Sequence, residues 1–164
     1  MHERSLPVLA LDVDGTVLPY LPNTWPRPPA PNGFTEDRAW GFDVWVGVHL
    51  RAALPRLAES FDIVWVTDWE ENANVEVSEL VGLPVTLPFL PKPKIERRSW
   101  WKLDVLADYV GARDLAWADD QMRASARAWA HARPQATLLI KPDRWSGLSA
   151  RHVQKLEVFA RSRA

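Results

Sequence analysis

The fold of this chain is decided close to its N-terminus, by the stretch VLALDVDGT at residues 8–16. Four apolar residues in a row are typical of a strand that is buried on both faces of a parallel sheet. Gly15 favours an abrupt turn after this strand, because it has no side chain to collide with the backbone. Ligands of open parallel sheets bind in the crevice at the carboxyl ends of the strands. We therefore expect the two aspartates of this stretch, Asp12 and Asp14, to take part in chemistry.

The spacing of the two aspartates indicates a cation site. Alternate side chains of an extended segment point to the same side, so Asp12 and Asp14 can converge on one bound group. Two carboxylates about 4 Å apart repel each other by roughly 4 kcal/mol at an effective dielectric constant near 20. A hard divalent ion such as Mg²⁺, which prefers oxygen ligands and often accompanies substrate phosphates, relieves that repulsion. In the alternative interpretation Asp14-Gly15 is an ordinary turn and Asp12 is a cap.

The composition is that of a globular protein of ordinary size. The chain has 164 residues, of which 47% are hydrophobic and 25% are charged, so we expect one domain spanning residues 1–164. Its net charge of −1 gives no overall attraction to nucleic acids or anionic membranes. Cysteine is absent, which excludes disulfides, thiolate zinc sites and cysteine nucleophiles. The ten tryptophans are expected to pack mainly in the core and under a flap.

The sequence shows no pattern of export or membrane insertion. Residues 1–7 leave no room for a signal peptide before the first strand. No uncharged apolar run reaches about 18 residues, the length typical of a transmembrane helix. We therefore expect a cytoplasmic protein with no membrane partner.

Strand and helix patterns alternate along almost the whole chain. Apolar runs typical of strands occur at residues 8–11, 61–67, 84–88, 115–118 and 136–140. Helical spacing or capping signals occur at residues 50–58, 70–81, 100–110, 121–132 and 149 to the C-terminus. This alternation predicts an α/β fold, a Rossmann-like doubly wound parallel sheet of about five strands.

The segment between the first two strands predicts a small flap and is too short for a separate cap domain. Residues 18–33 contain six prolines, which favour an irregular loop. Residues 34–48 alternate imperfectly and predict a short hairpin that covers the site. Farther along the chain, Ser99 is expected to cap the helix at 100–110, Gly111 to end it, and Ser149 to cap the last helix.

Polar residues at other strand ends complete a candidate site. Thr67 ends the second predicted strand, and Asp119-Asp120 follow the fourth. Because right-handed crossovers bring neighbouring strand ends to one edge of the sheet, these residues can meet Asp12 and Asp14 there. Thr67 could also simply end its strand.

A lysine is the natural partner for such a cluster of carboxylates. Lys102 is the best candidate, because it precedes the Asp119 strand and its long side chain could reach that edge. Lys92 and Lys94 are alternatives for this role. Asp120 could instead cap the following helix. Histidines without ligand spacing, which we interpret as structural or surface residues, are His2, His49, His131 and His152.

Together these motifs resemble those of the haloacid dehalogenase-like (HAD) hydrolase superfamily. The four motifs are LALDVDGT at 9–16, VWVT at 64–67, Lys102, and LAWADD at 115–120. The resemblance extends over essentially the whole chain. The details VTDWE at 66–70 and WADD at 117–120 also resemble a bacterial subgroup of capless domains, some of which occur in RNA-repair proteins.

The resemblance implies a Mg²⁺-dependent phosphatase. Asp12 would be the nucleophile that forms an aspartyl-phosphate, and Asp14 would be the general acid and then the general base. The presence of Asp14 argues against a dehalogenase, because the dehalogenases of the superfamily lack the second aspartate. Thr67 would hold a phosphate oxygen, and Lys102 would balance charge on the phosphorylated intermediate.

The resemblance also implies the metal ligands. Mg²⁺ would be held by Asp12, the carbonyl oxygen of Asp14 and Asp119, with Asp120 behind or beside it. Catalysis would then come mostly from positioning and charge neutralisation.

The same residues allow two other classes of function. A response-regulator receiver domain also combines a parallel sheet with acidic residues, a threonine and a lysine. Its phosphoacceptor, however, follows the third strand, and here the third predicted strand is followed by Phe89-Leu90-Pro91, which contains no acid. A non-catalytic phosphate-binding module is disfavoured, because all the expected catalytic side chains are present.

The sequence leaves the substrate open between a phosphorylated small molecule and a nucleic-acid end. Residues 92–102 interleave basic and aromatic side chains, which suits a nucleic-acid strand with stacked bases. More often such a run is a solvated loop and helix start whose tryptophans face the core.

Overall fold

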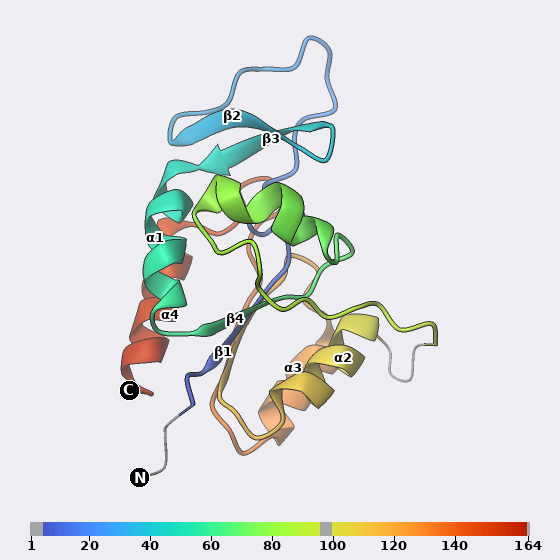
Figure 1. The fold of residues 1–164 in the computed structure, drawn as a ribbon, viewed down its shortest axis with the longest axis vertical. Helices are drawn as coiled ribbons and strands as arrows, with labels where there is room; N and C mark the ends of the chain where they lie inside the picture. Colours follow the sequence, from blue (N-terminus) through green and yellow to red (C-terminus); the bar gives the residue numbers. More distant parts are fainter. Residues whose placement is uncertain (1–4, 96–99, 164) are drawn as a thin grey trace.

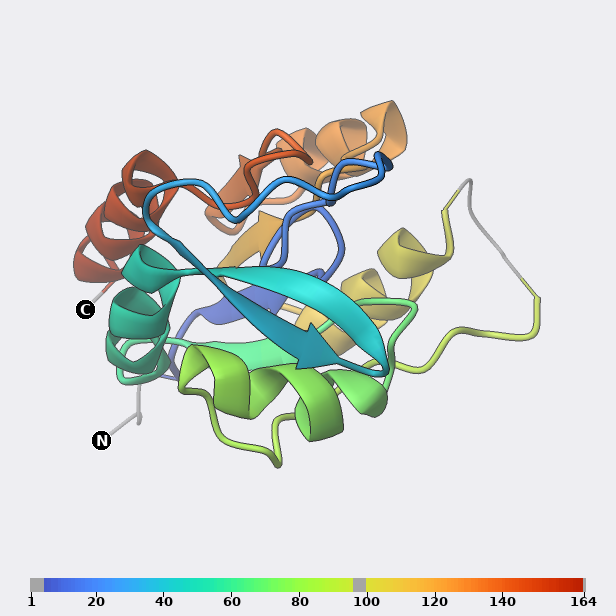
Figure 2. The same ribbon diagram turned by 90° about the horizontal axis from the view of Figure 1, so that it is seen from above.

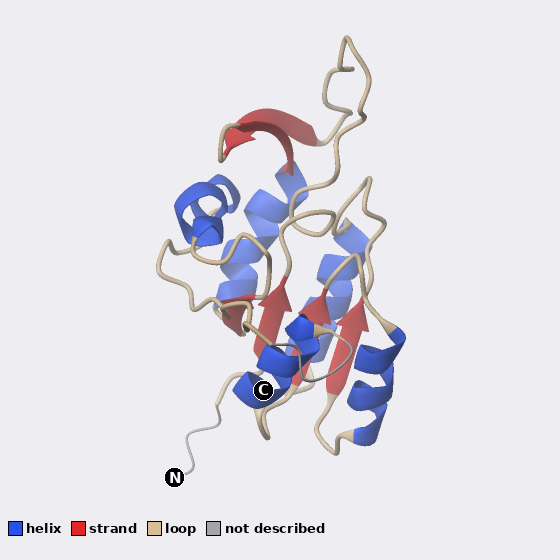
Figure 3. Ribbon diagram, turned by 90° about the vertical axis from the view of Figure 1, so that its right-hand side faces the viewer, coloured by secondary structure: helices blue, strands red, loops and turns tan. Residues whose placement is uncertain are grey.

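A four-stranded parallel sheet forms the centre of the molecule. The computed structural model describes residues 5–95 and 100–163. The strands, in the order in which they lie side by side, are β4 (Asp62–Trp65), β1 (Val8–Leu11), β5 (Leu115–Ala118) and β6 (Thr137–Ile140). All neighbouring pairs are parallel, and the strand arrows that are clearly visible in the sheet of Figure 3 point the same way. The predicted α/β fold class is confirmed.

Helices cover both faces of this sheet, as the doubly wound prediction requires. The helices α1 (Val48–Ala58) and α4 (Ala150–Arg161) lie on one side, and α2 (Trp101–Val110) and α3 (Ala124–Ala132) lie on the other (Figure 1). Alternate residues of β1 enter the two cores that result, because side chains of a strand point to opposite faces. Leu9 and Leu11 pack in the core with α1 and α4, whereas Val8 and Ala10 pack in the core with α2 and α3.

The segment between β1 and α1 contains the expected hairpin. The strands β2 (Phe34–Ala39) and β3 (Phe42–Gly47) are antiparallel, and the hairpin lies over the carboxyl end of the sheet (Figures 1 and 2). Its two turn residues, Trp40 and Gly41, have φ values of 49° and 78°, the combination that favours a tight two-residue turn. The Trp40 ring lies 5.2 Å from the Trp69 ring, centroid to centroid, which ties the hairpin to the loop after β4.

The prediction of a strand at residues 84–88 is wrong. In its place Phe89 forms a single parallel bridge to Trp65 of β4, so the described part of the sheet has four strands where about five were expected. Trp65 N donates to Pro88 O at 2.9 Å, and Leu90 N donates to Trp65 O at 3.0 Å. The physical reason is the two prolines at 84 and 88, which have no N–H to donate to a longer ladder.

The helix predicted at 70–81 begins later and is not a regular α-helix. A turn of π-helix, η1 (Asn74–Ser78), leads into a turn of 3₁₀-helix, η2 (Glu79–Val81). Two buried polar side chains explain the irregular winding. The indole Nε1 of Trp65 donates to Asn74 Oδ1 at 3.1 Å and to Ser78 Oγ at 3.3 Å, so this segment bends to satisfy a buried donor.

Some of the predicted helix starts and ends are confirmed and others are not. Ser149 caps α4, and Gly111, with a φ of 52°, ends α2, both as expected. Ser99 lies outside the described residues, and α2 begins after Trp100. The helix predicted at 121–132 starts only at Ala124.

Over the described ranges, no helix combines the length and the apolar character that a membrane span requires.

Candidate functional site

The site forms where two neighbouring strands end. Asp12 directly follows β1 and Asp119 directly follows β5. The backbone ladder continues into both residues, because Asp12 N donates to Ala118 O at 3.2 Å and Asp119 N donates to Ile140 O at 3.0 Å. The chain leaves β1 for β4 on one side and returns to β5 on the other, so this is the point of the sheet where the strand order reverses and ligands bind.

Three aspartates converge at this point. One oxygen each of Asp12, Asp119 and Asp120 lies within 4.8 Å of the others, and the exposed fractions of the three residues are 5%, 0% and 3%. Gly15 makes the approach possible. It has a φ of +71°, and a Cβ atom there would lie 2.7 Å from Cγ of Asp120, so a side chain at this position would clash with the cluster.

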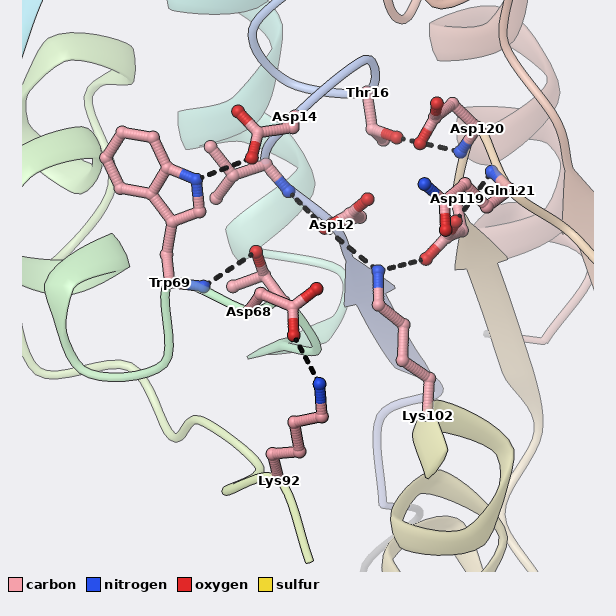
Figure 4. A network of polar contacts seen from close by, with 12 residues as sticks. Asp12, Asp14, Thr16, Asp68, Trp69, Lys92, Lys102, Asp119, Asp120 and Gln121 are labelled. Atoms are coloured by element: carbon pink, nitrogen blue, oxygen red, sulfur yellow. Dashed lines mark hydrogen bonds and ion pairs between the residues drawn. The ribbon is translucent and has the colours of Figure 1, made fainter. Parts of the chain in front are cut away.

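Lys102 is the buried cation of the cluster. It extends from the first turn of α2, and its Nζ lies 2.6 Å from Asp119 Oδ2 and 3.1 Å from Asp12 Oδ1 (Figure 4). The other lysines considered for this position lie elsewhere. Lys92 Nζ is 3.3 Å from Asp68 Oδ1 at the surface, and Lys94 is exposed.

Burial and charge perturb the titration of the cluster. Burial raises the pKa of Asp12 and the Asp119 charge raises it further, although the Lys102 ammonium lowers it. Burial also raises the pKa of Asp120, and Asp119 adds to that effect. Burial alone would lower the pKa of Lys102, but Asp12 and Asp119 outweigh it, so the net pKa lies above its usual value. Such strongly perturbed carboxyls at a strand edge are typical of functional sites.

Asp120 fits a cation ligand better than a helix cap. Neither of its carboxylate oxygens accepts a hydrogen bond, although the side chain is almost fully buried. Arg144 Nη2 lies 3.3 Å from Asp120 Oδ2, and the Asp120 backbone N donates to Thr16 Oγ1 at 3.1 Å. The alternative interpretation, in which Asp120 caps the following helix, is wrong, because α3 begins at Ala124, four residues later, with Arg123 at its N-cap.

The donor set suits a hard divalent cation. Three buried carboxylates and one buried ammonium leave two formal negative charges, and the half-exposed Arg144 offsets one of them. Buried carboxylate oxygens that accept no hydrogen bond, in a cluster with excess negative charge, fit an ion such as Mg²⁺, which takes oxygen ligands. Asp12, Asp119 and Asp120 could therefore hold a metal ion.

Asp14 and Thr67 lie beside this cluster, in the wall of a small cavity. The Asp14 carboxylate is exposed and accepts from Trp69 Nε1 at 2.8 Å, and Thr67 Oγ1 accepts from Trp69 N at 3.3 Å. Asp14 is not one of the three clustered carboxylates, so its contact with a metal ion stays a prediction. The cavity, of about 40 Å³, is lined by Asp12, Asp14, Tyr20, Thr67, Asp68, Lys102, Asp120 and Gln121.

Sequence reasoning overlooked several side chains that support the site. Thr16 and Gly15 are part of the quoted motif, but the sequence does not show that they lie against Asp120, because that proximity arises only in the folded chain. Trp69 contacts both Asp14 and Thr67, and its place two residues after Thr67 is only a weak signal in the sequence. Arg144 carries no sequence signal, because it lies in an irregular loop between β6 and α4.

The basic and aromatic run at 92–102 does not offer stacked rings to a nucleic acid. Trp100 and Trp101 are buried in the core with α2, and the Trp100 ring stacks on Trp117 at 5.0 Å, centroid to centroid. Lys92 Nζ lies 5.6 Å from the Trp101 ring centroid. The interpretation in which these tryptophans face the core is confirmed.

Comparison with known proteins identifies no relative. The chain matches no protein-family model, no curated protein and no solved structure.

Proposed function

We propose that this protein is a Mg²⁺-dependent phosphomonoester hydrolase of the HAD type. The observation that supports this best is the position of Lys102 Nζ, which contacts Asp12 and Asp119 where β1 and β5 end. A buried ammonium between two strand-end carboxylates suits a site that handles a phosphoryl group, because such transfers depend mostly on positioning and charge neutralisation. The substrate is a phosphorylated small molecule or a nucleic-acid end, with no membrane partner.

Asp12 is the proposed nucleophile. Val13 N donates to Asp12 Oδ1 at 2.8 Å, and Lys102 lies 3.1 Å from the same oxygen, so these contacts orient the second oxygen for attack. That oxygen forms a bond to phosphorus while the bond from phosphorus to the leaving oxygen breaks, which produces an aspartyl-phosphate. A water molecule then attacks phosphorus, which releases phosphate and restores the carboxylate.

Asp14 is the proposed proton donor and acceptor. Its exposed carboxylate lies in the cavity wall and is held by the Trp69 indole, so it can exchange protons with solvent and keep a fixed orientation. In the first step it gives a proton to the leaving oxygen, and in the second it takes a proton from water. Thr67, also in the cavity wall, would hold a phosphate oxygen.

The buried carboxylates of Asp12, Asp119 and Asp120 would hold the Mg²⁺ ion, with the carbonyl oxygen of Asp14 as a further ligand. A bound ion of this kind supplies positive charge beside the phosphoryl oxygens. Lys102 would balance the charge that the aspartyl-phosphate adds to Asp12.

Hydrolysis of p-nitrophenyl phosphate tests this proposal. We expect turnover with Mg²⁺, loss of turnover with EDTA, and no turnover in Asp12→Asn. Asp14→Asn should lower the rate by about 10²–10⁴-fold, the usual contribution of general acid–base catalysis. Asp68→Asn is the matched control, because Asp68 lines the same cavity but pairs with Lys92 at the surface, and it should keep wild-type turnover. Wild-type activity of Asp12→Asn, or EDTA-resistant turnover, would refute the proposal.

A further inference from the structure

A second and larger pocket opens beside the acidic cavity. It has a volume of about 550 Å³ and lies between the hairpin, the loop after β1 and the loop after β4. Asp14 and Tyr20 line both spaces. A group bound in the larger pocket is therefore adjacent to the proposed proton donor, on the side where the leaving group of a phosphomonoester would lie.

Aromatic rings from three separate segments form the walls of this larger pocket. They belong to Tyr20, Trp40, Phe42 and Trp69, and we call the space the aromatic pocket. Phe42 is 64% exposed and Trp40 is 47% exposed, although both are large apolar side chains. Exposed rings gathered around a concavity are typical of a ligand site, because their burial against a ligand is favourable.

The charged side chains of the aromatic pocket are engaged with protein partners. Arg27 Nη1 lies 2.9 Å from Asp43 Oδ2, and Asp14 Oδ2 accepts from the Trp69 indole at 2.8 Å. The pocket therefore presents mainly apolar surface to a ligand, including the exposed rings of Trp40 and Phe42. Ring surfaces bind a planar aromatic group by stacking and discriminate poorly between different aromatic groups.

We propose that the aromatic pocket binds the base of a nucleoside monophosphate whose phosphate enters the acidic cavity. This inference rests on the proposed function and names its substrate class. The volume exceeds that of a single six-membered ring and lies in the range typical of small-molecule sites, about 300–1,000 Å³. A ribose links base and phosphate in such a ligand, which suits two spaces that meet at Asp14 and Tyr20.

A matched pair of substrates tests the inference. AMP and ribose 5-phosphate have the same leaving oxygen and differ in the base, so a difference in kcat/KM reports the contribution of the base. We expect kcat/KM to be about tenfold or more higher for AMP, the size of effect that one stacked base supplies. UMP should lie within about fivefold of AMP, because stacking tolerates different bases.

One variant with its control assigns the effect to the pocket. Phe42→Ala should raise KM for AMP by about fivefold or more and leave ribose 5-phosphate unchanged, because the side chain is exposed and lies outside the proposed catalytic groups. Trp25→Ala removes an aromatic side chain that is 95% exposed and does not line the pocket, and should change neither substrate. An equal loss for AMP in Trp25→Ala, or no loss in Phe42→Ala, would overturn the assignment.

Failure of the inference and failure of the proposed function are distinguishable. If p-nitrophenyl phosphate is hydrolysed but AMP is no better than ribose 5-phosphate, the inference is overturned and the phosphatase stands. If no phosphomonoester is hydrolysed, the proposed function is overturned. Calorimetry on Asp12→Asn then tests separately whether the aromatic pocket binds the base. The affinity for AMP should be at least about tenfold higher than the affinity for ribose 5-phosphate. Equal binding of the two would overturn the pocket assignment.

Discussion

At the scale of single residues, the site depends on one buried lysine. Lys102 contacts Asp12 and Asp119 while only 4% of its surface is exposed, so its one positive charge is shared between two buried carboxylates. Such a buried group stabilises the fold only as long as its partners are present, because an unpaired buried charge is strongly unfavourable.

Lys102→Met should therefore destabilise the metal-free protein strongly. The substitution leaves two buried carboxylates facing each other, and removing one partner of a buried ion pair costs about 3–5 kcal/mol. Urea unfolding measures the free energy directly. Lys92→Met is the control, because its pair with Asp68 is half exposed and should contribute at most about 1 kcal/mol. Equal losses in the two variants would contradict the role of Lys102.

Asp120→Asn should behave in the opposite way. Both Asp120 oxygens lack hydrogen bonds, and burial and the Asp119 charge raise its pKa, so a neutral side chain removes a repulsion. The metal-free variant should be at least as stable as the wild type in urea. Asp119→Asn is the contrast, because it weakens the 2.6 Å contact with Lys102 and should lower stability. A destabilised Asp120→Asn would show that its pair with Arg144 outweighs the repulsion.

At the scale of elements, side-chain hydrogen bonds at Ser149 fix where α4 begins. The first turn of α4 is closed by a reciprocal pair, in which His152 N donates to Ser149 Oγ at 3.3 Å and Ser149 N donates to His152 Nδ1 at 3.1 Å. This capping box needs a neutral imidazole, because Nδ1 must accept. Burial lowers the pKa of His152, and the neighbouring Lys155 and Arg151 lower it further.

Acid should weaken α4 through this cap. Folding lowers the pKa of His152. The contribution of the cap to the free energy of unfolding is therefore complete above the unfolded-state pKa of about 6.5, and it is lost as the pH falls through the lower folded-state pKa. His152→Gln keeps an acceptor that does not titrate. The wild type should lose about 1 kcal/mol relative to this variant between pH 7.5 and pH 5, measured by urea unfolding. A difference that does not depend on pH would contradict this cap.

At the scale of the whole molecule, folding brings the charged groups of the site together. Asp12 follows β1, Asp119 and Asp120 follow β5 more than a hundred residues later, and Lys102 comes from α2 on one face of the sheet. An unfolded chain holds Asp12 far from Asp119 and Asp120, so an ion that the three aspartates hold together binds only the folded state.

Mg²⁺ should therefore raise the melting temperature of the whole protein. At one hundred times its dissociation constant an ion stabilises by about 2.7 kcal/mol, which corresponds to roughly 5–11 °C for a chain of this size. Thermal melts with and without Mg²⁺ measure the shift, and Asp120→Asn should show a smaller one. If both proteins shift equally, Asp120 is not a ligand of the ion.

The sequence alone was enough for features that depend on local pattern. The apolar run of β1, the alternation of strands and helices, and the position of Asp12 and Asp119 at strand ends follow from neighbouring residues, and the structure contains them. The Ser149 cap and the hairpin at β2 and β3 are of the same kind, because turn and cap chemistry acts over a few residues.

Only the tertiary structure decided which distant groups meet. It placed Lys102, and neither Lys92 nor Lys94, between the buried aspartates, and it brought Arg144 to Asp120. It also reduced the predicted strand at 84–88 to one bridge and wound η1 as a π-helix around a buried indole. These outcomes depend on burial and on hydrogen-bond partners far away in the sequence, and no local pattern of residue types specifies such partners.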